Sequence, residues 1–284
     1  MADYVTEFIP EIWSARILEA KEKVHLFGRF ANRNYQGELV YGQTVRIPQI
    51  GYPAINTYTR NNFATGLTGE YANVSDMILT IDQEKYFDVW FDDVDIKQSK
   101  ISFMDEFANK AAYKIADTQD SYIAGLYGQA GIKTTSNSAS TYVTLGSSNV
   151  RTQFLLMGKA FDQANIPRDN RWGIIPAELV FELTDAGILE QSNNDRLWAS
   201  GSAPDAYGFK VYMSNNVSST GGGYFKILFG YGQESITMAE QLNKVEAGRL
   251  QQEGFGYFTK GLHTYGARII PDRTGVMYAY IAND

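Results

Sequence analysis

The order of apolar and polar positions predicts that the chain begins with a helix and continues into a long two-stranded arm. Apolar residues recur at helical spacing from about Pro10 to Val24, with Thr6 as a possible cap and the proline in the first turn. A polar break at 32–37 follows. Strand-like patterns then flank a polar insert, 56–75, which is rich in Asn, Thr, Gly and Tyr.

The strands of this arm are expected at 38–48 and 87–95. Pro48 and Pro53 disfavour pairing inside a sheet, because proline has no N–H to donate to a ladder. The second strand alternates with a period of two and carries aromatic rings on both faces, so both faces are expected to contact something. We therefore expect the arm to lie in solvent or under a partner subunit, and to offer little core to its apolar residues Val45, Ile47, Phe87, Val89 and Phe91.

A helix-length apolar pattern runs from Ile101 to Ile123. Ser99 or Ser102 can cap this helix, and Gly128 and Gly131 can end it. A helix of roughly 30 residues would be about 40 Å long. The pattern therefore predicts a spine that runs the length of the subunit. Its apolar stripe consists of Phe103, Met104, Phe107, Ala108, Ala111, Ile115 and Tyr122.

The second half of the chain mixes helices and strands, which predicts an α+β fold. The stretch 236–252 is ambiguous, since its apolar spacing suits a helix or an irregular strand. The other patterns predict helices at 150–165 and 177–185, and strands at 142–145, 172–176, 209–213, 224–229, 255–270 and 276–281.

Composition narrows the function classes. The chain has 284 residues, of which 44% are hydrophobic, so it can build a substantial core. It contains no cysteine, which excludes disulfides, thiolate nucleophiles and zinc–thiolate sites. It has neither an apolar run of membrane-spanning length nor an export signal at Met1–Pro10. The net charge of −7 is dispersed, and no basic cluster of the kind that binds nucleic acid is present.

Three groups of residues are candidates for a metal-binding, catalytic or phosphate-binding site. Clustered carboxylates bind hard cations and share protons, so Asp92, Asp93 and Asp95 form the best candidate. Capping and salt bridging at the junction between strand and helix is the favoured interpretation of these residues. His25 and His263, the only imidazoles, lie far apart and have no Asp or Glu at metal-binding spacing. The glycine-rich stretches 221–223 and 230–232 lack the Lys-Ser/Thr pair of a phosphate loop and are interpreted as turns. We expect no catalytic, cofactor-binding or metal site.

Taken in order, these pieces resemble the major capsid proteins of tailed bacteriophages, which have the Hong Kong 97 capsid fold. The resemblance spans most of the chain and depends on the order and spacing of the motifs rather than on any one of them. The residues that carry it are Ile9–Trp13, Gly42–Pro48, Asp92–Asp95, Ile166–Pro167, Arg171, Pro176, Gly208–Asn215 and Gly261–Arg268.

The resemblance implies four structural parts: an N-terminal arm at 1–36, an extended loop at 37–96, a peripheral domain with the spine helix at 97–149 and 256–284, and an axial domain at 150–255. It implies pentameric and hexameric rings that build an icosahedral or prolate head around double-stranded DNA, which lies close to the protein without specific binding. It implies no enzymatic activity, no cofactor and no membrane partner. Its further implications are assembly in the bacterial host cytoplasm, a portal protein at one vertex and a possible decoration protein. Because the arm begins within ten residues of Met1, a separate scaffolding protein is expected.

Two other classes remain open from the sequence. The first is a metal-dependent hydrolase that uses Asp92, Asp93 and Asp95, which would show chelator-sensitive activity as a monomer. The second is a β-rich binding or adhesion module, which the many Tyr and Asn residues would suit. Such a module would bind a ligand strongly without self-assembly.

Overall fold

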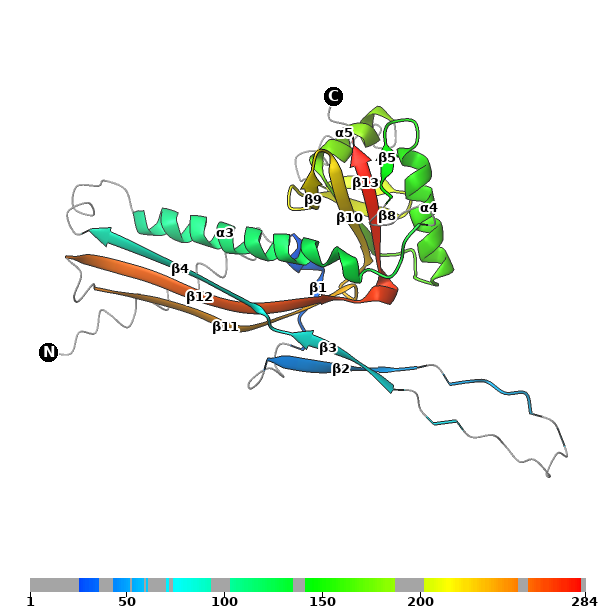
Figure 1. Cartoon of the computed structure of the whole chain (residues 1–284), viewed down its shortest axis with the longest axis horizontal. Coiled ribbons are helices and arrows are strands. Elements are labelled where there is room, and N and C mark those ends of the chain that lie inside the picture. The colour runs from blue at the N-terminus through cyan, green and yellow to red at the C-terminus, as the bar shows by residue number, and fades with distance from the viewer. Residues whose placement is uncertain are drawn as a thin grey trace.

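The chain folds into a long sheet with a helix along it, a second sheet unit at one end, and a loop that projects from the base of that unit (Figure 1). This computed structural model describes residues 26–35, 43–51, 53–58, 60, 70–71, 74–92, 103–134, 141–186, 202–249 and 255–281. The helix expected at 10–24, the possible caps Ser99 and Ser102, and the acidic residues Asp93 and Asp95 lie outside the described residues.

The long sheet has the strand order β1-β11-β12-β4 among the described residues. Strands β11 and β12 form an antiparallel hairpin that pairs thirteen residues of each strand from Ile236↔Ile269 to Arg249↔Tyr257, and β4 pairs antiparallel with the other edge of β12. The stretch that the sequence left ambiguous is thus a strand. The members of the sheet are β1 (Ala31–Asn32), β4 (Gln83–Asp92), β11 (Ile236–Arg249) and β12 (Gly256–Ile269).

Helix α3 (Phe103–Gly125) confirms the predicted spine and lies along the long sheet (Figure 1). Its 23 residues correspond to about 35 Å at 1.5 Å per residue. Phe107 on the helix contacts the rings of Phe87 and Phe91 on β4, with ring centroids 6.0 and 5.7 Å away. The helix continues into the 3-10 turn η3 (Leu126–Gln129), so it ends before the predicted glycines. No helix among the described residues is long and apolar enough to cross a membrane.

The seven-stranded sheet has the order β5-β13-β10-β6-β8-β7, with β9 paired to β10. Helix α4 (Val150–Gln163) packs on one of its faces, and α5 (Ala177–Asp185) contacts α4. Phe154 and Phe161 of α4 meet Phe229 and Phe209 of the sheet at centroid distances of 5.6 and 5.2 Å. The strands are β5 (Val143–Leu145), β6 (Arg171–Ile175), β7 (Ser202–Ala206), β8 (Phe209–Met213), β9 (Ser218–Gly221), β10 (Tyr224–Tyr231) and β13 (Thr274–Ile281). The sequence predicted neither β7 nor β9.

The pairing predicted for the arm was wrong. Strand β2 (Thr44–Ile50) pairs with β3 (Val74–Thr80), not with 87–95. The stretch 87–92 belongs to β4 and pairs with β12. After β3 the chain passes through Ile81 and Asp82 into β4 of the long sheet. The apolar face of β4 packs against α3 there. The apolar residues of the arm therefore do have an intramolecular core.

The described chain passes between the two sheets three times: from η3 toward β5, from β10 to β11, and from β12 to β13. These passages are hydrogen-bonded to one another. The Ser235 carbonyl accepts from the Ile270 amide at 2.9 Å and from the Thr274 hydroxyl at 3.0 Å. Ile132 forms a parallel bridge with Gly275. The two sheets are thus joined along a shared seam.

Asp162, at the end of α4, forms ion pairs that should make the stability of the seven-stranded sheet unit depend on pH in acid. Hydrogen bonds from Arg168 and from the buried Arg171, each at 2.7 Å, lower the pKa of Asp162 to about 2. A depressed carboxyl pKa contributes stability above its unfolded value, and this contribution is lost as pH falls toward 2. Asp162→Asn should therefore flatten the decline of the unfolding midpoint between about pH 4 and pH 2, measured by circular dichroism. Equal slopes for both proteins would contradict this assignment.

Candidate assembly surfaces

The base of the β2–β3 hairpin is anchored to the long sheet. Val45 and Ile47 of β2 and Leu79 of β3 are buried in one cluster with Ala239 of β11. The Arg268 side chain on β12 donates a hydrogen bond to the Ile78 carbonyl at 2.8 Å. The direction in which the hairpin leaves the subunit is therefore set by packing and not by a free linker.

The crossing of the hairpin over β12 depends on a glycine. A Cβ atom on Gly266 would lie 2.0 Å from the Thr80 carbonyl oxygen, closer than any side chain tolerates. Just beyond the crossing, the Tyr122 hydroxyl on α3 donates to the Asp82 carboxylate at 2.7 Å. Burial, and then this hydrogen bond, raise the pKa of Tyr122 above its ordinary value. The tyrosine therefore stays a neutral donor throughout the physiological pH range.

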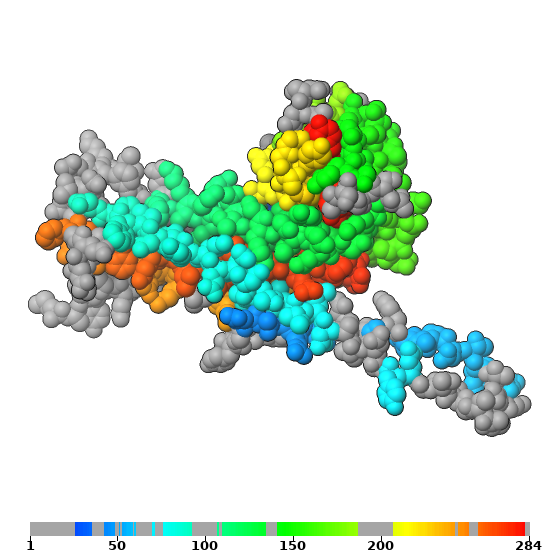
Figure 2. All heavy atoms as spheres, viewed as in Figure 1, coloured from blue at the N-terminus to red at the C-terminus, as the bar shows by residue number. Residues whose placement is uncertain are grey.

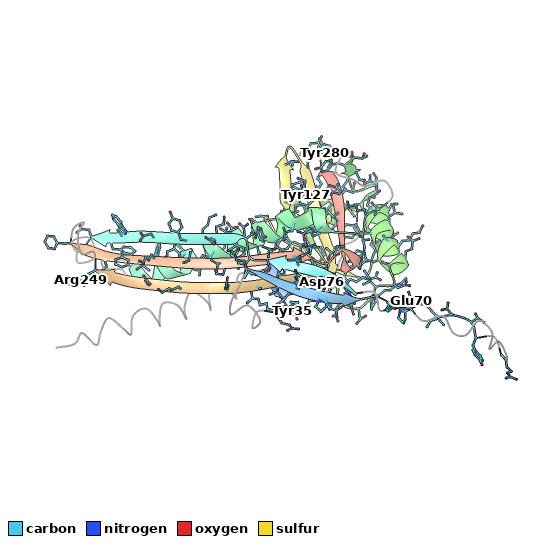
Figure 3. The ribbon with its side chains drawn as sticks, turned by 60° about the horizontal axis from the view of Figure 1, so that its bottom comes forward. Tyr35, Glu70, Asp76, Tyr127, Arg249 and Tyr280 are labelled. Carbon is cyan, nitrogen blue, oxygen red and sulfur yellow. The ribbon has the colours of Figure 1, made fainter. Side chains whose placement is uncertain are left out.

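The loop beyond the hairpin carries apolar side chains that the subunit does not cover. Ile55 is 92% exposed, Tyr58 68% and Tyr71 98%. The Glu70 carboxylate accepts a hydrogen bond from the Ala54 amide at 2.9 Å across the loop. Residues after β2 extend as a narrow finger beyond the body of the molecule (Figure 2), and Glu70 lies on this projection (Figure 3). Exposed apolar groups of this size mark an interaction surface.

A groove of about 370 Å³ lies between α3 and the long sheet. Its floor is apolar and includes Phe87, Phe107 and Val245. Lys85 and Lys114 are exposed residues on its rim, and Lys114 also pairs with Asp117 at 2.8 Å. On the outer face of β4, Tyr86 is 81% exposed and Trp90 56%. The groove and this face together offer apolar surface on α3 and the long sheet, which extend away from the projecting loop (Figure 1).

His263 has a structural environment that the sequence did not reveal. Its ring is 3% exposed and lies 3.4 Å from the Glu240 carboxylate, which also accepts from the Gln119 side chain at 3.2 Å. Tyr265 stacks on the imidazole with centroids 4.9 Å apart. Gln119 comes from α3 and Glu240 from β11, so the cluster ties the spine helix to the long sheet. Only the fold brings Gln119 to the other two residues, because more than a hundred positions separate it from Glu240 and from His263 along the chain.

Of the candidate acidic residues and imidazoles, the structure describes only Asp92 and His263. Asp92 is the last residue of β4 and is exposed, Asp93 and Asp95 lie outside the described residues, and so does His25. Within the described ranges no three His, Asp or Glu residues come together as they would around a metal ion.

The glycines of 221–223 have positive φ angles and form the tight turn between β9 and β10, as predicted. The same interpretation was wrong for Gly230 and Tyr231, which pair with β6 inside β10, and a turn begins only at Gly232.

An anchored hairpin, a projecting apolar loop and a long spine characterise the fold of this chain. Several solved structures share this fold. The chain has a TM-score of 0.73 and 23% identity to a structure of Mycobacterium phage Che8, covering 89% of this chain and 90% of that one. For the capsid of cyanophage P-SCSP1u the values are 0.70 and 18%, over 92% and 89% of the two chains. For a virus-like particle from Pyrococcus furiosus they are 0.58 and 14%, over 95% and 99%.

The family is shown by sequence. A family model described as phage capsid protein matches residues 77–279. The chain belongs to this family: it is a structural protein, a major capsid protein of a tailed bacteriophage with the Hong Kong 97-type fold, and its place is the virion capsid. No curated protein matches the chain. The findings give no support to a hydrolase or an adhesion module.

Proposed function

We propose that this subunit assembles into pentameric and hexameric rings that close into an icosahedral or prolate head around double-stranded DNA. The observation that carries the proposal is the loop of residues 53–71, in which the described apolar side chains Ile55, Tyr58 and Tyr71 are exposed although the base of the loop is anchored. Burial of such side chains between copies would supply much of the free energy of assembly. In this proposal the protein performs no catalytic turnover.

In this arrangement the loop of one subunit covers the groove between α3 and the long sheet of its neighbour. The loop projects from one end of the molecule, and the groove lies along the other (Figure 1). Contact between two different surfaces is head-to-tail, which generates rings. The division into arm, loop, peripheral domain and axial domain is part of the proposal. The long sheet with α3 forms the peripheral domain, which takes in β4 and β11, and the seven-stranded sheet with α4 and α5 forms the axial domain.

The partners beyond this chain belong to the proposal as well. A separate scaffolding protein selects the curvature, a portal protein occupies one vertex, and the finished shell has a decoration protein as a possible further partner. Assembly takes place in the host cytoplasm. The dispersed charge of −7 is compatible with a wall that holds packaged DNA without binding it.

Removal of the projecting loop tests the proposal. A variant in which a short Gly-Ser turn replaces residues 53–71 keeps β2, β3 and their buried cluster. It should fold with an unfolding midpoint close to that of the intact protein, yet form no shells under negative-stain microscopy. As a control that keeps the loop length, Ile55, Tyr58 and Tyr71 are all changed to Ser, which should weaken assembly in the same direction. Normal particles from the truncated chain would reject the role assigned to the loop.

A further inference from the structure

Two helices of the axial domain carry surface stripes of opposite charge. On α4, the exposed residues Arg151, Leu155 and Lys159 recur every four positions and therefore lie on one face. On α5, Glu178, Phe181 and Asp185 also lie on one face, at spacings of three and four. We call these sets the α4 stripe and the α5 stripe. Each has a charged residue at either end and an apolar side chain between them.

The two stripes match in length as well as in charge. At 1.5 Å per residue, the end charges are about 12 Å apart on α4 and about 10 Å apart on α5. The apolar residues at the centres stand in solvent: Leu155 is 49% exposed and Phe181 73%. Glu182, one turn after Glu178, adds a third carboxylate to the α5 stripe. Laid against each other, the stripes would pair charges at both ends and bury both apolar side chains between them.

Neither stripe is paired within the described part of the subunit. The described structure contains no hydrogen bond or ion pair from the side chains of either set, whereas the neighbouring Asp162 is paired with both Arg168 and Arg171. Helix α4 runs along the side of the seven-stranded sheet, and α5 lies toward the end farthest from the long sheet (Figure 1). The stripes therefore face solvent at different places on the domain.

We propose that the α4 stripe of one subunit docks on the α5 stripe of the next subunit in the ring. This inference rests on the proposed function, and it names the contact that holds the axial domains together. Because the two surfaces differ, the contact is head-to-tail, and it repeats around a ring until the ring closes. Exposed ion pairs add little affinity, but they select the partner and set the register, since like charges in contact are disfavoured. The apolar pair at the centre supplies the burial.

Charge reversal tests this pairing. The first variant, Arg151→Glu with Lys159→Glu, has two acidic stripes, and the second, Glu178→Lys with Asp185→Lys, has two basic ones. Each variant alone should lose rings and shells by about tenfold or more at matched protein concentration, because like charges now meet. All four residues are exposed, so circular dichroism and the unfolding midpoint should stay those of the unmodified protein. Lys133→Glu with Lys210→Glu makes the same change in net charge as the first variant, at other exposed positions, and should assemble normally.

A mixture of the two variants gives a sharper result. In an alternating ring, every contact again joins a basic stripe to an acidic one, so mixing should restore rings. Alternation requires an even number of subunits, and six-membered rings should therefore form without five-membered ones. Because closed shells need pentamers, the mixture should give sheets or tubes. A single chain with all four reversals should instead recover both ring sizes and closed shells.

The outcomes separate this pairing from the capsid proposal. Normal shells from either reversed variant would overturn the pairing, because the stripes would then not be contacts between subunits. The capsid proposal would stay intact. Failure of both the mixture and the four-residue variant to restore rings would also overturn the pairing. If the unmodified chain forms no rings or shells with or without its scaffolding protein, both proposals fall together.

Discussion

Proline in place of Ala112 should prevent the subunit from folding into an assembly-competent form. Ala112 lies near the middle of α3 and is fully buried against the long sheet, beside Val245. Proline removes one helical hydrogen bond, and its ring clashes with the preceding turn, at a cost of about 3 kcal/mol or more. The break would also misplace Phe107 and Gln119, which join the helix to β4 and to the buried His263–Glu240 pair. Insoluble protein or an absence of particles is the expected result.

The matched control places the same residue where a helix accepts it. Met104 lies in the first turn of α3, where the backbone N–H has no partner within the helix. Met104→Pro should therefore leave the thermal unfolding midpoint much closer to that of the unmodified protein. Equal solubility and equal assembly of the two proline variants would show that the spine does not act as one continuous helix.

Alanine in place of Gly266 should separate folding from assembly. The added methyl group would meet the Thr80 carbonyl oxygen at 2.0 Å, and the obstacle is backbone, which cannot rotate away. The hairpin must move off β12, so the hydrogen bond from Arg268 to Ile78 and the cluster around Leu79 are strained or lost. Overpacking of this kind costs about 1–3 kcal/mol. We expect a lower unfolding midpoint, and few or no shells because the loop now leaves at the wrong angle.

Gly125 supplies the control for this substitution. It is the last residue of α3, and a Cβ atom there has no neighbour within 4 Å. Gly125→Ala should therefore assemble normally and melt at or slightly above the original temperature. If Gly266→Ala gave normal shells at an unchanged melting temperature, the crossing would have room that the structure does not show.

Elements with one clear period could be predicted from the sequence alone. Residues 177–185 were predicted as a helix and 209–213 as a strand, and both bounds are those of the structure. The spine was predicted for the same reason, since its apolar stripe repeats over six turns. In each case the pattern is local and the partner surface does not have to be known.

The pairing of the arm could not be predicted, because residues far away in the sequence determine which strand pairs with β2. The second strand of the hairpin, β3, begins inside the polar insert, and only Met77 and Leu79 mark its buried face. Their partner Ala239 is more than 150 positions away. From the sequence alone, residues 87–92 were equally suitable as the strand that pairs with β2. In the structure these residues pair with β12 and pack against α3. Alternation shows that a strand has a buried face, but not which sheet buries it.

The assembly surfaces were visible only in part. The sequence predicted that the loop would be exposed, and exposures above 90% for Ile55 and Tyr71 agree with that. The spacing of the residues in the α4 and α5 stripes can be recognised in the sequence. Many helices have a charged face toward solvent, however, and only the structure shows that no described residue of the subunit pairs with these charges. The buried His263–Glu240–Gln119 cluster had no sequence signal at all, since three separate elements contribute one residue each.

The seam between the two sheets bears on how a filled shell would carry tension. Pressure from inside a closed container stretches its wall, and each subunit then transmits a pull between its two sheets. Here the pull is divided among three strand or helix connections that are bonded to one another through Ser235 and Ile132. Because the connections are bonded to one another, a pull on one of them is passed to the others. Rupture of a filled shell should therefore begin at the contacts between subunits and leave the subunits themselves folded.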